Sequence, residues 1–132
     1  NYMDLKVSVS YGELVDKLTI LNIKKIKITD SNKLKEINIE LKILEEKAEV
    51  LKNSNADDYS KLFKKLYEVN LKLWEVEDRI RIHELNNEFN EKFIELARSV
   101  YFLNDERFEI KSDINKCFES KINEVKQYTK YK

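Results

Sequence analysis

The sequence predicts an all-α protein, an antiparallel four-helix bundle made of paired helical hairpins. The chain of 132 residues contains no proline and a single glycine, whereas β-structure needs such residues at its many turns. Charged residues make up 38% of the chain and hydrophobic residues 42%, which is typical of amphipathic helices with solvated outer faces. Over three long segments the apolar residues recur at alternating spacings of three and four, the period of a helix. We expect one domain over residues 1–132, with an extended lead-in at 1–9 and a tail at 120–132.

The first helix is expected from Tyr11 to Ile28. Ser10 precedes it and Glu13 follows three residues later, which is the pattern of a capping box. The apolar residues of this segment lie on three sides of a helical wheel rather than on one stripe. Because a helix that is apolar on most sides is buried on most sides, we predict that it is central in the bundle or shared with a second subunit.

The other three helices follow from the spacing of their apolar residues. This spacing extends over residues 34–51, 59–83 and 89–117, and turn residues separate the segments at 29–32, 53–55 and 86–87. The last two helices have about 29 residues each, or roughly 43 Å at 1.5 Å per residue. Their equal length and short connection predict a long antiparallel helical hairpin.

Charge and cysteine content exclude several classes of function. Lys and Arg number 25, as do Asp and Glu, and a nucleic-acid partner is not expected without a basic excess. No run of about 18 apolar residues occurs and no signal peptide is expected, so we predict no membrane partner. Cys117 is the single cysteine and cannot form an internal disulfide, which fits a reducing cytoplasm.

Several polar residues fall on the faces that the last two helices are expected to bury. A helical wheel places them among the leucines, valines and isoleucines of the inward face. Burying a charge without a partner costs several kcal/mol, so these groups must pair, reach water or bind something. They are Asn70, Glu77, Arg81 and Glu84 on the third helix and Asn104, Arg107 and Lys111 on the fourth.

This polar cluster has two interpretations. It can be a structural layer, in which carboxylates at 77, 78 and 84 pair with cations at 81, 98, 107 and 111 and fix the register of the helices. It can instead be a pocket in which Arg81, Arg107 and Lys111 clamp a carboxylate or a phosphate. Glu77 is then the candidate catalytic acid or base. The ligand-binding residues of this second interpretation also include Asn70, Asn104 and Glu84.

Five carboxylates offer a weaker metal hypothesis. They resemble the E-E-x-x-E … E-x-x-D pattern with which all-α nucleoside triphosphate pyrophosphohydrolases hold Mg²⁺. On the wheel, however, one of them faces away from the core, and a chain rich in Glu produces such spacings by chance. This interpretation is therefore the least favoured. The carboxylates are Glu45, Glu46, Glu49, Glu75 and Asp78, and Glu75 is the one that faces away.

No cofactor and no other metal site is expected. His83 is the only histidine, and Ile80 stands where a di-iron bundle needs a Glu three residues earlier. His83 is therefore interpreted as a seam residue near a helix end, and Cys117 as a small core residue. Gly12 leaves N–H groups at a helix start that an anion could bind, but an ordinary first-turn residue is favoured.

Three blocks of the chain resemble a known family. The first is GELVDKLTIL at 12–21, the second is LWEVEDRIR at 73–81, and the third lies within 93–115. Together they resemble a family of small bacterial and phage proteins that is classed as a domain of unknown function. The resemblance implies a cytoplasmic single-domain protein and no particular reaction. It places the polar signature of the family on Asp16, Lys17, Glu77, Asp78, Arg81, Asn104, Asp105, Arg107 and Lys111.

The favoured functional hypothesis is a non-enzymatic helical interaction or scaffold module that works in the cytoplasm as a homodimer. It rests on the first helix, which is apolar on most sides, on the long hairpin, and on the lack of a recognisable catalytic constellation. The alternative is a small all-α enzyme or binder of an anionic metabolite, which uses the polar cluster between the last two helices.

Overall fold

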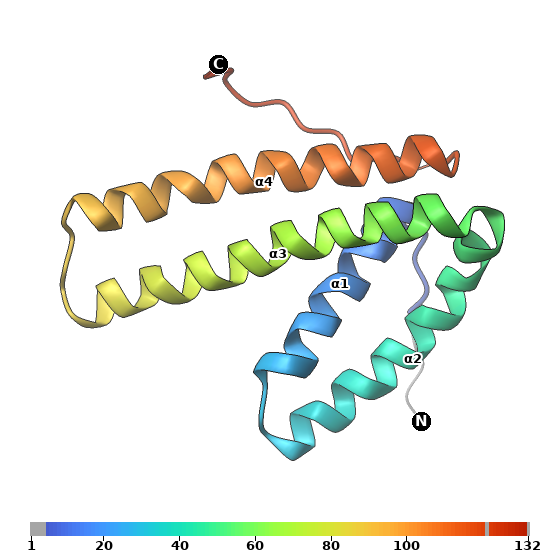
Figure 1. Ribbon diagram of the computed structural model, residues 1–132, viewed down its shortest axis with the longest axis horizontal. Coiled ribbons are helices and arrows are strands. Elements are labelled where there is room, and N and C mark those ends of the chain that lie inside the picture. The colour runs from blue at the N-terminus through green and yellow to red at the C-terminus, as the bar shows by residue number, and fades with distance from the viewer. Residues whose placement is uncertain (1–4, 121, 132) are drawn as a thin grey trace.

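The computed structural model describes residues 5–120 and 122–131 and confirms the all-α fold. None of the described residues is in a strand, and residues 5–10 and 122–131 are not helical. The part of the expected lead-in at 1–4 lies outside the described residues. The four helices of the described range are α1 Tyr11–Lys27, α2 Ser31–Ser54, α3 Ala56–Leu85 and α4 Glu91–Cys117 (Figure 1).

Each helix begins at a side chain that accepts a hydrogen bond from its first turn, which explains why the boundaries follow the sequence. At α1, the Ser10 hydroxyl oxygen accepts from the backbone N–H of Glu13 at 3.1 Å, as predicted. Such caps satisfy N–H groups that have no partner inside the helix. The same role is taken by Asp30, Asn55 and Asn90 at the starts of α2, α3 and α4.

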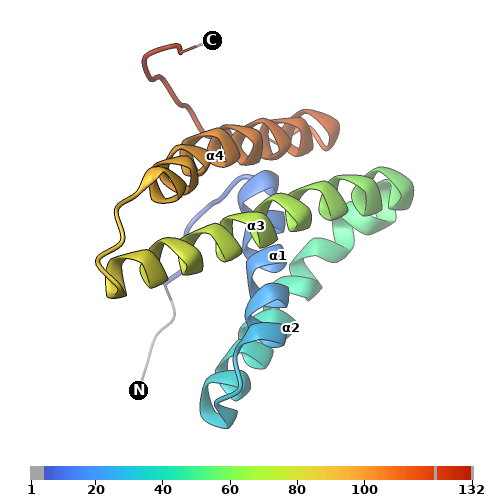
Figure 2. The ribbon, with the colours of Figure 1, turned by 60° about the vertical axis from the view of Figure 1, so that its left-hand side comes forward.

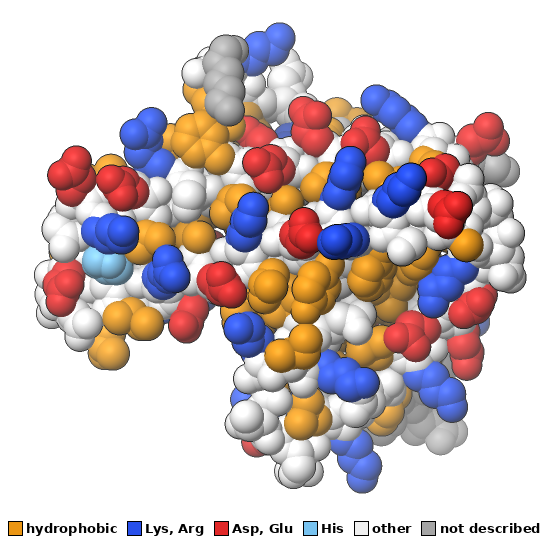
Figure 3. Space-filling view, in the orientation of Figure 1, with side chains coloured by type: hydrophobic (Ala, Val, Ile, Leu, Met, Phe, Trp, Pro, Cys, Tyr) orange, Lys and Arg blue, Asp and Glu red, His pale blue; other side chains and the backbone are white. Residues whose placement is uncertain are grey.

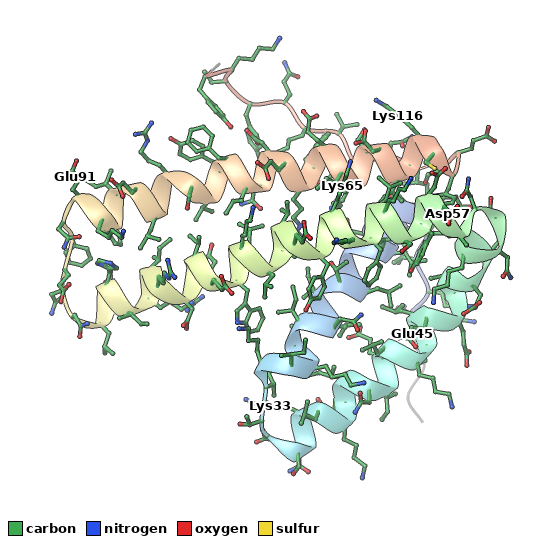
Figure 4. All side chains as sticks on the ribbon, in the orientation of Figure 1. Lys33, Glu45, Asp57, Lys65, Glu91 and Lys116 are labelled. Atoms are coloured by element: carbon green, nitrogen blue, oxygen red, sulfur yellow. The ribbon has the colours of Figure 1, made fainter. Side chains whose placement is uncertain are left out.

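The helices form two antiparallel hairpins, α1–α2 and α3–α4, which cross at a steep angle (Figures 1 and 2). The hairpins differ in length, since α3 has 30 residues and α1 has 17. At about 1.5 Å per residue these are roughly 45 Å and 26 Å. One half of the long hairpin therefore projects beyond α1. Figure 4 shows Glu91 at this projecting end and Asp57 and Lys116 at the opposite end.

The hydrophobic core lies where the two hairpins cross. Helix α1 packs against all three other helices, and its Val15, Leu18 and Leu21 are buried together with Leu66 of α3 and Ile114 of α4. Each fully buried leucine contributes on the order of 1.5–3 kcal/mol. Of the two positions predicted for the first helix, central or shared with a second subunit, the structure shows the central one.

The projecting half of the α3–α4 hairpin has only two layers. Its seam residues, such as Ile80 and Phe93, are half-buried, and Ile82, Leu85 and Phe89 are exposed. No helix of the described part of the chain covers these residues. The projecting half therefore presents apolar side chains that the core does not use.

Candidate functional site

Asp16 of α1 is a carboxylate that the fold buries almost completely, with 1% of the residue exposed. Arg107 of α4 binds it with two hydrogen bonds, from Nε to Oδ1 at 2.9 Å and from Nη2 to Oδ2 at 2.5 Å. Asn70 of α3 donates from Nδ2 to the same Oδ1 at 2.9 Å. The carboxylate thus joins three helices through charge-assisted hydrogen bonds.

Thr19 completes this group from one turn further along α1. Its hydroxyl donates to the backbone carbonyl oxygen of Asp16 at 2.7 Å and accepts from Asn70 Nδ2 at 2.8 Å. We call the four residues Asp16, Thr19, Asn70 and Arg107 the Asp16 network. Among the described residues, no buried side-chain nitrogen or oxygen lacks a hydrogen-bond partner. A fully satisfied buried network of this kind rigidifies a core.

Lys111 is a second cation on α4 and is buried, with 5% of the residue exposed. Its Nζ lies 2.8 Å from a carboxylate oxygen of Glu13 on α1 and 2.8 Å from one of Glu124 in the tail. Burial lowers the pKa of the Lys111 ammonium, but the ion pairs with Glu124 and Glu13 outweigh it, so that the pKa is raised. The hydrogen bond to Asp16 likewise raises the pKa of Arg107. Both cations are therefore held charged by partners inside the protein.

Gly12 brings the start of α1 directly against the backbone of α4. Its N–H donates to Asn115 Oδ1 at 2.7 Å, and a Cβ at this position would lie 2.5 Å from the carbonyl oxygen of Lys111. Beside it, the N–H of Tyr11 donates to the Ser120 hydroxyl at 3.3 Å. The N–H groups at this helix start have partners within the protein, so the structure does not leave them to an anion.

A cleft of about 380 Å³ opens next to the Asp16 network, between α1 and the projecting half of α3. Figure 3 shows the notch below the long hairpin, with apolar side chains gathered where the hairpins meet. Arg107 and Asn70 border its inner end. Ile20, Ile23, Leu73 and Trp74 form apolar walls, and the rim is lined by Glu77, Asp78 and Arg81.

The charge of this cleft does not suit an anion. Arg81, Glu77 and Asp78 make no ion pair within the described part of the chain, so the rim has two carboxylates and one cation. Arg107 adds no excess charge, because Asp16 neutralises it. A carboxylate or phosphate would meet repulsion from the two acidic groups.

The structure divides the polar cluster that the sequence predicted. Asn70, Arg107 and Lys111 do turn inward, but their partners are Asp16, Thr19, Glu13 and Glu124 rather than Glu77. The expectation that Glu77, Arg81 and Glu84 point into the bundle was wrong, because all three are exposed. The wheel gives the correct side of α3 for Glu77 and Arg81, but α1 is too short to cover that stretch. Asn104 is half-buried and lines a separate groove beside the tail.

The remaining chemical candidates lie apart or at the surface. Glu45, Glu46, Glu49, Glu75 and Asp78 are all exposed, and the described residues contain no group of three His, Cys, Asp or Glu placed to hold a metal ion. Cys117, expected in the core, is exposed, with Sγ 3.6 Å from Asp58 Oδ2. His83 is a half-buried seam residue whose Nδ1 lies 2.9 Å from the carbonyl oxygen of Glu88. Over the described range, no helix has the length and apolar character needed to cross a membrane.

Comparison with known proteins gives one match. The model of DUF6165, a family of unknown function, matches residues 5–131, which confirms the resemblance found in the sequence. No curated protein and no solved structure matches the chain.

Proposed function

This chain belongs to the family DUF6165, and we propose that it is a non-enzymatic helical interaction module that works as a homodimer. The interface is the stretch of α3 beyond α1, consisting of Trp74, Glu77, Asp78, Arg81 and Leu85, which we call the α3 face. The observation that carries the proposal is the exposure of this stretch, in which Leu85 is 79% exposed. Apolar side chains that share one surface and are rimmed by charged groups, as Trp74 and Leu85 are here, are typical of a surface that packs against another protein.

The α3 face is complementary to a second copy of itself. In a symmetric pair, residue i of one copy contacts residue j of the other, and the reverse contact also forms. An antiparallel pairing of α3 with its copy about residue 79 places Glu77 opposite Arg81 in two symmetric contacts. The same register places Leu85 opposite Leu73 of the cleft wall. Charges that are unpaired in one copy thus find partners in the other, which favours a second copy over an unrelated partner.

The alternative of an anion-binding enzyme has less support. The half-buried Arg107 is paired with Asp16, and the buried Lys111 is paired with Glu13 and Glu124. The candidate acid or base Glu77 is exposed, so the cleft does not shield it from water as a closed active site would. The free thiol of Cys117 is exposed, which supports a reducing compartment such as the cytoplasm as the place of action.

Sedimentation velocity of the purified chain tests the proposed dimer. At about 50 µM we expect the wild type to sediment as a dimer and Leu85→Asp as a monomer, because the variant puts a charge at the apolar contact. Arg81→Glu is expected to weaken the dimer, and Glu77→Arg combined with Arg81→Glu to restore it. Ile39→Asp, at an exposed isoleucine of α2, is the matched control and should remain a dimer. A wild type that sediments as a 15.9 kDa monomer at this concentration contradicts the proposal.

A further inference from the structure

The tail, residues 122–131, lies along α4 without regular secondary structure. Polar contacts fix it to two positions of the helix. Lys126 Nζ lies 3.4 Å from Asp105 Oδ1, the Tyr131 hydroxyl donates to Asp105 Oδ2, and Glu124 pairs with Lys111. The hydrogen bond to Asp105 raises the pKa of Tyr131 to about 12. The tail is therefore attached by specific side chains rather than by a helix or a strand.

Aromatic contacts add to these polar ones. The ring of Tyr131 meets the rings of Tyr101 and Phe102 edge to face, with centroids 5.3 and 5.2 Å apart. The ammonium group of Lys126 lies 5.7 Å from the centre of the Phe108 ring. Edge-to-face and cation–π contacts both favour the attachment of the tail to α4. The surface of α4 thus recognises one lysine and one tyrosine, five residues apart in an extended segment.

The tail does not fill the space that it covers. A groove of about 1420 Å³ remains between it and α4, and the tail stands off the helix in both ribbon views (Figures 1 and 2). Val125 of the tail does not line the groove and is 89% exposed, and Tyr128 lines it but still has 76% of its surface exposed. Apolar surface in this groove therefore stays in contact with water when the tail is bound, and a segment that covered it would gain binding energy.

We infer that this groove on α4 is a docking site for an extended segment of a partner protein, and that the tail occupies it as a stand-in. The partner segment has a lysine and a tyrosine spaced as Lys126 and Tyr131 are, with an apolar side chain between them that enters the groove. Asp105, Glu106 and Glu109 line the groove and match a basic segment in charge. The tail of a second copy would fill the groove no better than the chain's own tail does.

This site is separate from the proposed dimer interface, because it lies on α4 and the α3 face lies beside α1. Its occupation by the tail is intramolecular, and a short tether holds a segment at an effective concentration of about 1 mM. A partner must therefore displace the tail. Variants that weaken the attachment of the tail to α4 are expected to increase the affinity of the groove for an added peptide.

Fluorescence anisotropy with a labelled peptide of residues 122–131 tests the inference. The receptor is the full chain with Lys126→Ala and Tyr131→Ala, which removes the contacts of the tail with Asp105, Tyr101 and Phe102, keeps the ion pair of Glu124 with Lys111, and leaves the residues of α4 unchanged. We expect this variant to bind the peptide at least about tenfold more tightly than the wild type. Adding Asp105→Ala should remove the gain, whereas adding Glu95→Ala, at an exposed residue of α4 outside the groove, should keep it.

Circular dichroism checks that each variant keeps its helices. Tyr131→Phe removes only one hydroxyl, and we expect it to raise the affinity for the peptide less than the double variant does. The inference is overturned if the peptide does not bind the double variant, or binds equally well without Asp105. It is also overturned if sedimentation shows a dimer that Lys126→Ala with Tyr131→Ala abolishes and Leu85→Asp preserves. That result would assign the groove to exchange of tails between two copies.

Discussion

Replacing Arg107 by Met is expected to destabilise the fold by about 3 kcal/mol. The substitution leaves the carboxylate of Asp16 buried, with the amide of Asn70 as its remaining side-chain donor. Breaking a buried ion pair from one side costs about 3–5 kcal/mol. The lower end of this range applies here because the Arg107 side chain is 30% exposed. The ion pair is therefore only partly buried, and its guanidinium keeps some of its hydration in the folded protein. Against a total stability of about 5–15 kcal/mol, this loss is large.

The converse substitution is expected to cost less. Asp16→Asn leaves Arg107 without its carboxylate, but the guanidinium borders the cleft and can turn to water there, so we expect about 1.5–2 kcal/mol. The double variant removes both charges. Its loss should fall short of the sum of the single losses by about 1.5 kcal/mol or more, which is the coupling energy of the pair.

Urea unfolding followed by far-ultraviolet circular dichroism measures these values. Lys17→Met is the matched control on α1, because its ion pair with Glu40 has an N–O distance of 3.6 Å and both side chains are about half exposed. Such a pair contributes about 0–1 kcal/mol. If Arg107→Met costs no more than Lys17→Met, or if the two losses in the double variant simply add, then the Asp16 network does not hold the hairpins together.

Two further predictions concern the contact between α1 and α4. Gly12→Ala should lower the free energy of unfolding by about 1–2 kcal/mol, since overpacking against the Lys111 carbonyl outweighs the helix propensity gained; a more stable variant in a thermal melt would contradict the close contact. The ion pairs of Lys111 raise its pKa above the ordinary 10.5, so the stability they contribute is fully present below that value and is lost as the pH rises through the raised value. The difference in urea midpoint between the wild type and Lys111→Met should therefore be constant up to about pH 10 and shrink once the pH exceeds the ordinary 10.5. A difference that stays constant above that pH would refute the role of the charge.

Most of the fold can be predicted from the sequence because it depends on local features. Capping residues such as Ser10 and Asn55 mark helix starts, and the alternating spacing of apolar residues marks the buried side of each helix. The central place of α1 follows from its apolar residues on several sides. These features act within a few residues of one another, so no knowledge of tertiary contacts is needed.

The candidate site is less predictable because it depends on which helix covers which. A helical wheel places Glu77 and Arg81 on the same side as Asn70, yet only Asn70 lies beneath α1 and is buried. The partner of Arg107 was also missed. Asp16 stands between Val15 and Leu18 in a largely apolar helix, and this placement is a signal that could have identified it as a buried carboxylate.

Other contacts leave no signal in a single sequence. The hydrogen bond from Gly12 to Asn115 joins residues 103 positions apart, and the attachment of Tyr131 to Asp105 involves a tail without periodicity. Such pairs are set by the docking of whole elements. They emerge only when the packing of the hairpins is known.

The fluorescence of Trp74 tests the proposed homodimer most directly. Trp74 is the only tryptophan of the chain, belongs to the α3 face and lines the cleft, so self-association through that face should remove water from its ring. As the protein concentration rises from about 1 µM to about 100 µM, we predict that the emission maximum of the wild type moves to shorter wavelength. The emission of Leu85→Asp should stay unchanged over the same range. A wild-type emission that does not depend on concentration, or a shift that Leu85→Asp shares, would contradict the α3 face as the interface.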